Sequence, residues 1–420
     1  MGAHLIVWGI HDDVGTEIIF QDVFAEPRTA DLIRFIVPQG PDYNAILRTD
    51  MPVALRYFLG SMLLHHFVRT SDIDGLAAYG FSDAGNSGEA LRVIAPTDLD
   101  RHILDMFVQS NAQTSSTESI TESISSALRL VPGDATLLFL RSYFEGFYLG
   151  NLNRARADVD LLKGILGETN MTLWSEMNLA LPEEDYDRIL ELSERLNPGV
   201  PGYGIPFSYR QIALVMSGEF AQAQTELEDE VAEGLVFGLP LWDTIAALLY
   251  AIQGDETRFA EAVSRVQASR DLEQSASFIT SINNPPPAFY LMGGYVAELS
   301  NENLQAVLTY QTGLSLNSQN FLLSWRQGAI AEATGNDTSA FGHYQTAREQ
   351  APVPFPTVTY ALAQVARRAS NALPDGTLTD CEWLAEAFRE ANENASFYAL
   401  LLADIRATDA EWACGVVRDT

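Results

Sequence analysis

Residues 287–352 read PAFYLMGGYVAELSNENLQAVLTYQTGLSLNSQNFLLSWRQGAIAEATGNDTSAFGHYQTAREQAP. Within this stretch, small and aromatic residues recur after an interval of 34 residues: Gly294, Ala297, Ala306 and Tyr310 are followed by Gly328, Ala331, Ala340 and Tyr344. A fixed interval of this length indicates copies of one small unit, which must stack on its neighbours to bury its apolar face. The sequence therefore predicts an array of repeated units over residues 287–352.

The repeated residues suit a pair of helices joined by a turn. Apolar residues recur at helical spacing, and Gly335-Asn336-Asp337 interrupts them with residues that end one helix and begin the next. Gly328 and Ala340 would let the two helices approach closely, while Tyr344 fills the space beside them. Pro352 would end the second helix, because proline has no N–H to donate to the helical hydrogen bonds.

This spacing and these residue types resemble the tetratricopeptide repeat (TPR), in which small residues lie where two helices cross and an aromatic residue lies on the second helix. Weaker copies occur upstream, where a glycine is followed five or six residues later by an alanine: Gly150 with Ala155, Gly218 with Ala223, and Gly254 with Ala260. The resemblance implies a mainly α fold. We expect a TPR-like α-solenoid of helix-turn-helix repeats over residues 51–420.

Residues 1–50 have a different pattern, which indicates a small α/β segment that contains a hairpin. Alternating apolar residues in 4–9, a turn around Asp12 to Gly15, and a β-rich run in 17–23 predict two paired strands, with a third strand at 32–37. The opening strand resembles that of the amino-terminal domain of TolB-like proteins, through Gly2, Ala3, Leu5, Ile6, Val7 and Gly9. That resemblance implies a truncated domain, so we expect residues upstream of Met1 to be missing.

The charge of the chain limits its partners. The sequence has 56 acidic and 25 basic residues and a formal charge of −31, and Lys163 is the only lysine. Nucleic acid is bound chiefly through clustered lysine and arginine, so we expect neither nucleic acid nor an anionic membrane surface as a partner. The longest apolar runs, such as 398–403, are far shorter than the ~20 residues of a membrane span. A protein or peptide with basic residues is the expected partner, and self-association stays open.

A candidate partner site follows from the register of the two clear repeats. In TPR proteins the first helix of each pair lines a concave groove, and this face would carry aromatic, aliphatic and acidic residues: Leu291, Tyr295, Glu298, Leu322, Trp325 and Glu332. Aromatic anchors beside carboxylates suit a peptide that bears arginine or lysine. The alternative is that Tyr295 and Trp325 pack against the neighbouring repeat.

Catalytic, metal and cofactor sites are not expected. His65 and His66 are adjacent on a helix and point about 100° apart, so they cannot both bind one metal ion. The acidic runs, such as 226–230, have the pattern of hydrated helix surfaces, and no phosphate-binding glycine loop occurs. We therefore expect a non-catalytic protein-binding scaffold. The alternative is a ligand-sensing or assembly subunit, whose α/β segment binds a small molecule and whose solenoid oligomerises.

The two cysteines, Cys381 and Cys414, both lie near the carboxyl end of the chain, on either side of an expected helix pair. They could form a disulfide that closes the end of the array, or remain two buried thiols, and two cysteines alone leave both readings open. An acidic, lysine-poor chain with a possible carboxy-terminal disulfide and a missing amino terminus fits the extracytoplasmic part of a membrane-tethered bacterial protein slightly better than a cytoplasmic scaffold.

Overall fold

The computed structural model describes residues 5–11, 15–22, 32–38, 102, 116–197, 204–232, 240–268, 286–369, 373 and 377–416. Contacts divide the chain into two compact units: the first comprises 1–179 and 195–206, and the second comprises 180–194 and 207–420. The domain boundary expected between residues 50 and 51 lies outside the described residues and stays a prediction. His65 and His66 also lie outside the described residues, so the expectation that they bind no metal ion stays a prediction as well.

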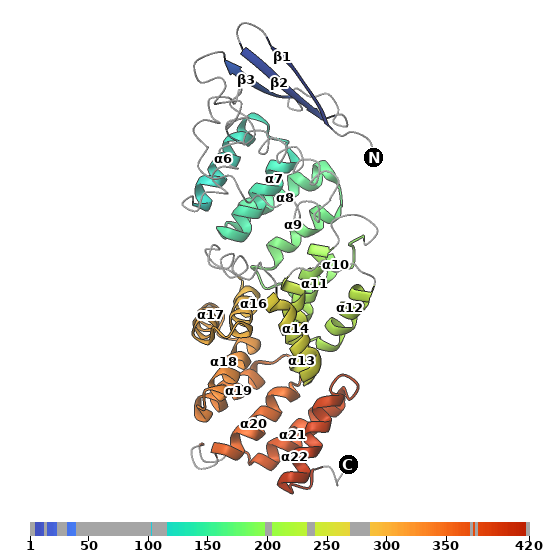
Figure 1. Ribbon diagram of the computed structural model, residues 1–420, viewed down its shortest axis with the longest axis vertical. Coiled ribbons are helices and arrows are strands. Elements are labelled where there is room, and N and C mark those ends of the chain that lie inside the picture. Colours follow the sequence, from blue (N-terminus) through green and yellow to red (C-terminus); the bar gives the residue numbers. More distant parts are fainter. Residues whose placement is uncertain are drawn as a thin grey trace. The chain divides into compact units, whose positions relative to one another are not determined.

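The first unit opens with three antiparallel strands in the order β1-β2-β3 (Figure 1): β1 (Leu5–His11), β2 (Gly15–Asp22) and β3 (Leu32–Pro38). Their register pairs Val7 with Phe20 and Ile18 with Phe35. These strands are the hairpin and the third strand that the alternation of apolar residues predicted.

The helices described in the first unit are α6 (Thr117–Leu130), α7 (Ala135–Tyr143), a π-helical turn η2 (Phe144–Tyr148), α8 (Leu152–Leu166) and most of α9 (Asn170–Ala180). Asp134 caps α7 by accepting a hydrogen bond from the backbone N–H of Leu137, at 2.9 Å. Ala155, Val159 and Leu179 are buried together between α8 and α9. Gly150 separates the π-helical turn from α8 with a φ of 70°, a backbone conformation that favours glycine.

The second unit is a stack of helix pairs, shown from green to red in Figure 1: α10 (Tyr186–Ser193), α11 (Gly204–Met216), α12 (Phe220–Ala232), α13 (Pro240–Gln253), α14 (Glu256–Ala268), α16 (Pro287–Leu299), α17 (Asn303–Leu316), α18 (Phe321–Ala333), α19 (Asp337–Gln350), α20 (Pro356–Ala369), α21 (Asp380–Glu393) and α22 (Ala399–Trp412). The helical part of the chain is thus a TPR-like α-solenoid of helix-turn-helix repeats. None of the helices within the described ranges combines the length and the apolarity that a bilayer crossing needs.

The two clear repeats have the packing that their residue types predict. Ala306 and Ala340 are completely buried, on the second helices α17 and α19. A Cβ added at Gly328 would lie only 2.5 Å from the ring of Tyr344, and Gly294 meets the ring of Tyr310 in the same way. In each repeat the tyrosine ring fits only because the facing residue is glycine, since a side chain at the glycine would occupy the space of the ring.

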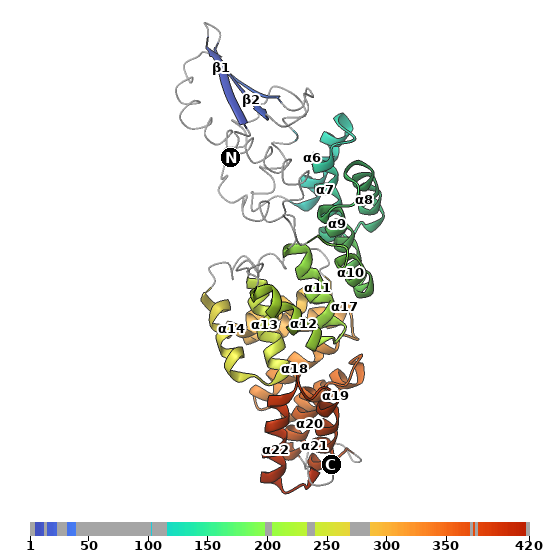
Figure 2. The same ribbon diagram turned by 90° about the vertical axis from the view of Figure 1, so that its right-hand side faces the viewer.

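Helices α13 and α14 contact α16, and α13 also contacts α22 (Figures 1 and 2). Phe220 of α12 contacts Phe321 of α18 and Phe355, with ring centroids 6.3 and 5.4 Å apart, and Trp325 stacks edge-on against Phe355 at 5.3 Å. We call these four residues the aromatic seam. Because its members are at most 5 % exposed, the seam joins the two groups of helices through buried apolar surface.

The carboxyl-terminal helices are joined by a disulfide between Cys381 at the start of α21 and Cys414 beyond the end of α22. The two Cα atoms are 5.4 Å apart and the cysteines are 33 residues apart in the sequence. Because the bond closes a loop around α21 and α22, it restricts the unfolded chain more than a short loop would.

The close approach of α18 and α19 gives the first prediction. Replacing Gly328 with alanine forces the Tyr344 ring to move, so we expect the free energy of unfolding to fall by ~1–3 kcal/mol. Gly342 is the matched control, because it lies inside α19 and no heavy atom lies within 4 Å of an added Cβ. Gly342→Ala should be neutral or stabilise the helix by ~0.5–1 kcal/mol. Denaturant unfolding measures both, and equal effects would contradict the repeat register.

The disulfide gives the second prediction. The unreduced native chain should contain no titratable thiol, and reduction should lower the free energy of unfolding by ~2–4 kcal/mol. The double variant Cys381→Ser with Cys414→Ser serves as the control, because a reductant should no longer change its melting temperature. Two reactive thiols in the freshly unfolded, unreduced protein would show that the bond is not formed.

Candidate functional site

The predicted groove residues come from two first helices, α16 and α18. The apolar members are buried: Leu291, Tyr295 and Leu322 have no exposed surface, and Trp325 is 4 % exposed. The expectation that these four side chains face an open groove does not hold, because other helices of the same chain cover that face. Tyr295 and Trp325 instead pack against neighbouring helices, which was the alternative for these two residues.

Two contacts identify what covers this face. The hydroxyl of Tyr295 donates a hydrogen bond to the backbone carbonyl of Ala247 in α13, at 3.3 Å. Trp325 belongs to the aromatic seam, which reaches α12 through Phe220. The sequence contained a sign of this covering, since α16 carries Glu298 as its only charged residue. A helix that is apolar on nearly all sides is buried on nearly all sides.

Glu298 lies at the centre of a largely buried polar cluster, and its own side chain is 17 % exposed. Arg326 of α18 donates to both of its carboxylate oxygens, with Nε 3.1 Å from Oε2 and Nη2 in contact with Oε1. The hydroxyl of Tyr310 in α17 donates to Oε2 at 3.0 Å. The Arg326 guanidinium also lies over the rings of Tyr295 and Trp325, at 5.0 and 4.6 Å from their centroids. The carboxylate therefore joins three consecutive helices.

Burial changes the titration of this cluster. Removal from water raises the pKa of Tyr310 well above its ordinary value, and the neighbouring charge of Glu298 raises it further. Burial also raises the pKa of Tyr295. For Arg326, burial disfavours the charged form, but the attraction of Glu298 outweighs it and the pKa of the guanidinium is raised. The tyrosines thus stay neutral and the guanidinium stays charged.

Glu332, 34 residues after Glu298, has the same kind of partners. The Tyr344 hydroxyl donates to Oε2 at 2.6 Å, and Arg368 of α20 donates to Oε1 at 2.6 Å. Arg368 is more exposed than Arg326, with side-chain exposures of 44 and 10 %, and it also contacts Asp337 at 3.0 Å. We call each set a Glu–Tyr–Arg clamp: the first is Glu298, Tyr310 and Arg326, and the second is Glu332, Tyr344 and Arg368.

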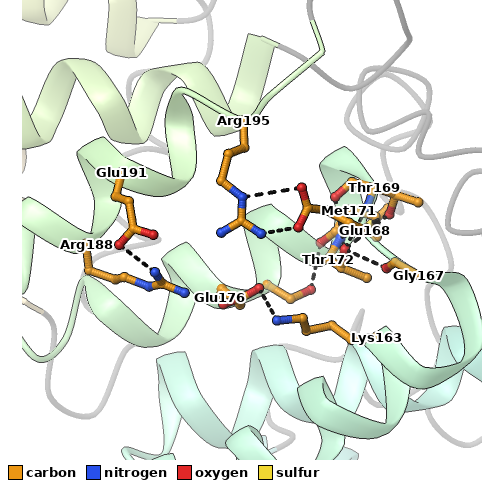
Figure 3. Close-up of polar contacts among 11 residues, drawn as sticks. Lys163, Gly167, Glu168, Thr169, Met171, Thr172, Glu176, Arg188, Glu191 and Arg195 are labelled. Atoms are coloured by element: carbon orange, nitrogen blue, oxygen red, sulfur yellow. Dashed lines mark hydrogen bonds and ion pairs between the residues drawn. The ribbon is translucent and has the colours of Figure 1, made fainter.

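Intramolecular ion pairs of this kind occur along both units. Figure 3 shows two of the first unit, Lys163 with Glu176 at 2.7 Å and Arg195 with Glu168, and one of the second, Arg188 with Glu191 at 2.6 Å. The chain's single lysine is thus paired. Most other described basic side chains also contact a carboxylate: Arg129, Arg141, Arg154, Arg210, Arg258, Arg265, Arg348, Arg367 and Arg389.

Groups with altered titration are spread over the second unit. Partial burial raises the pKa of Glu184, which accepts a hydrogen bond from Asn317. Partial burial and the charge of Glu256 raise the pKa of Asp404, and burial lowers the pKa of His343. Within the described residues, no three histidine, cysteine or acidic side chains gather where they could hold a metal ion.

Comparisons with known proteins give no family assignment. No protein-family model matches the chain, and no curated protein matches it. Among solved structures, the Cut9-Hcn1 hetero-tetramer of APC/C matches with 12 % identity, over 87 % of this chain and 68 % of that chain, at a TM-score of 0.34. Yeast Tom70 has 15 % identity, coverage of 85 and 73 %, and a TM-score of 0.27. A human IFIT1 dimer with PPP-AAAA has 13 % identity, coverage of 88 and 86 %, and a TM-score of 0.31. Likeness at this level says nothing about function.

The two clamps predict different costs for the same substitution. Glu298→Gln leaves Arg326 buried without a counter-charge, so the free energy of unfolding should fall by ~3–5 kcal/mol. Glu332→Gln is the matched control 34 residues away. Because Arg368 reaches solvent and keeps Asp337, this change should cost about 1 kcal/mol or less. Urea unfolding of both variants measures the difference, and equal losses would contradict the described burial of Arg326.

The buried tyrosines predict sensitivity to alkali. Tyrosine in the unfolded chain ionises near pH ~10, whereas the raised pKa values of Tyr295, Tyr310 and Tyr344 keep these residues protonated in the folded state. Since the unfolded state loses these protons first, the contribution of the tyrosines to stability should be constant below pH ~9 and should be lost as the pH rises through 10. Melting temperatures across this range measure the effect. The variant Tyr344→Phe should show a shallower decline, and an unchanged slope would argue against this origin.

Proposed function

We propose that the chain is a non-catalytic protein-binding scaffold, which presents the acidic outer faces of its helical repeats to a partner rich in arginine or lysine. The supporting observation is the use of basic side chains within the fold. Because most described arginines and the lysine are paired internally, the excess of acidic residues remains on the surface as uncompensated charge.

One acidic surface combines residues of α12, α14 and α22. Arg258 of α14 links Glu228 of α12, at 2.6 Å, to Asp255 at 2.7 Å. The adjacent Glu256 and the exposed Asp404 of α22 repel one another, since the charge of Glu256 helps to raise the pKa of Asp404. A cation from a partner would relieve this repulsion. The like-charged pair of Glu256 and Asp404 is therefore the part of the surface that we assign to basic partners.

The proposal of a non-catalytic role is supported by the arrangement of titratable groups. A general acid and base must converge on one cleft with separated pKa values. Of the two acids whose pKa values are raised, Glu184 lies in the turn before α10 and accepts a hydrogen bond from Asn317, whereas Asp404 lies on the exposed side of α22. An open hollow at the start of α8 is lined by residues 150–154 and Arg156, and it contains no acid, histidine, serine or cysteine. The alternative of a ligand-sensing α/β segment has no supporting contact among the described strands.

The residues predicted to line the groove have a structural role in this proposal. Leu291, Tyr295, Leu322 and Trp325 would support the scaffold from inside, since they hold the helices together, and a partner would meet the outer faces instead. Glu298 and Glu332 likewise serve the clamps. Substituting any of these residues would therefore test folding before it tests binding.

The test is affinity capture of basic partners from an extract of the source organism, followed by binding assays on the purified pair. We expect binding to weaken with added salt, because exposed charges are screened over ~8 Å at physiological ionic strength. The double variant Glu256→Gln with Asp404→Asn should weaken binding about 3- to 10-fold and flatten its salt dependence. It should fold normally, because neutralisation removes a repulsion.

A matched control carries the same loss of charge elsewhere. Glu349→Gln with Glu411→Gln removes two exposed carboxylates near the carboxyl ends of α19 and α22. If this control weakens binding as much as the first double variant, the partner senses only net charge and the assigned surface is wrong. Binding that is insensitive to salt would contradict the acidic-surface proposal.

A further inference from the structure

Helix α17 differs from every other helix that the structure describes. Its sequence, NLQAVLTYQTGLSL, contains no acidic residue, no arginine, no lysine and no histidine. The whole chain has 19 % charged residues, so a helix of 14 residues without any is a departure from its own background. Absence of charge usually accompanies burial, as in the nearly uncharged α16. For α17 this explanation fails.

Most of α17 is exposed. Only Ala306, Tyr310 and Gly313 are buried, and these residues face the first helices of the repeats. On the outer side, Leu304 is 75 % exposed, Leu308 is 50 % exposed and Leu316 is 53 % exposed. Single exposed leucines are common on protein surfaces and need no explanation. Three on one uncharged helix form an apolar surface of the kind that marks an interaction site.

The exposed leucines lie in a regular row. Leu304, Leu308, Thr312 and Leu316 are spaced by four residues, which forms one of the ridges by which helices pack together. We call these four residues the α17 ridge. Ridges of this spacing interdigitate with a like ridge of a second helix at a crossing angle of about −50°. The α17 ridge therefore has the form of a helix-packing surface that has no helix of its own repeat on it.

We propose that the α17 ridge is the interface through which two copies of this chain associate. The choice of occupant follows from charge. Two chains that each carry a formal charge of −31 repel one another wherever their acidic faces meet. The uncharged α17 is the described helix on which identical chains can meet at the least electrostatic cost. A basic partner would instead be drawn to the acidic faces.

The ridge is also self-complementary. In a two-fold symmetric pair the same surface patch meets itself, so the residues of the patch must match their own reversed order. With the two-fold axis between Leu308 and Thr312, Leu304 would meet the partner's Leu316, and Leu308 would meet the partner's Thr312. The exposed Gln311 and Ser315 beside the ridge would supply an uncharged polar rim.

This inference does not depend on the proposed scaffold function, and salt separates the two. Added salt screens the repulsion between two acidic chains and strengthens contact between apolar surfaces, so self-association should tighten as salt increases. Binding of a basic partner should weaken under the same change. A chain that dimerises but binds no basic partner would support this inference alone, and the reverse result would support the scaffold function alone.

The experiment is sedimentation equilibrium of the full chain over a range of concentrations and two salt concentrations. We expect a reversible monomer–dimer equilibrium. Leu308→Asp places two charges at the centre of the interface, so the dissociation constant should rise at least about 100-fold. Because Leu308 is half-exposed, the Leu308→Asp variant should keep the helical circular dichroism and the melting temperature of the unchanged monomer, measured at low concentration. Leu304→Gln, at the most exposed leucine of the ridge, should weaken the dimer about 10-fold. This milder variant tests the interface even if Leu308→Asp fails to fold.

Leu161→Asp is the matched control, since Leu161 is an exposed leucine on another helix, α8, with 54 % exposure. This variant should dimerise as the unchanged chain does. Three outcomes would overturn the inference: a monomer at all concentrations, a dimer that survives both Leu308→Asp and Leu304→Gln, or equal loss with Leu161→Asp. Higher-order association abolished by Leu308→Asp would also overturn the two-fold arrangement, because a closed pair leaves no ridge free.

Discussion

The ion pair between Glu298 and Arg326 is the interaction on which the clear repeats depend. A buried charge is tolerated only when it is fully paired, and here the carboxylate accepts from Arg326 and from Tyr310 while the guanidinium covers two aromatic rings. Three helices must keep one relative position to satisfy one carboxylate. The 34-residue interval repeats the glutamate and the tyrosine as Glu332 and Tyr344, whereas the arginine of the second clamp, Arg368, comes from outside this interval and is more exposed to solvent. The clamps thus turn a repeat of sequence into a fixed stacking of helices.

Use of arginine in such pairs also shapes the surface. Arginine suits this role because its planar guanidinium can contact two carboxylate oxygens at once, as Arg210 does with Glu226 at 2.7 Å. With most described basic residues already paired within the chain, the remaining acidic residues dominate the outer faces. Contacts from α12 and α13 cover the first-helix face of α16 and α18, which is the usual binding surface in an open solenoid. Under the proposed function, a partner would meet the outer helices, where acidic surfaces and the uncharged α17 offer two different kinds of contact.

The sequence by itself determined the elements whose causes are local. Alternation of apolar residues gave β1, β2 and β3, and the glycine–tyrosine pairs gave the crossing of α18 with α19. These features depend on residues that are near in sequence, or one repeat apart, so their spacing can be read from the chain. The cysteines show the limit: their positions allowed a bridge, and the packing of α21 with α22 brought Cys381 and Cys414 together.

Only the tertiary structure decided which faces stay open. Periodicity shows that Tyr295 and Trp325 share a face, but it cannot show what covers that face. The covering residues, Ala247 and Phe220, lie 48 and about 100 residues away in sequence, and no spacing rule connects them. The same holds for α17: an uncharged helix is usually a buried one, yet Leu304, Leu308 and Leu316 are exposed. A helix's pattern records how much apolar surface it carries, whereas the tertiary fold alone determines which part of that surface is already buried.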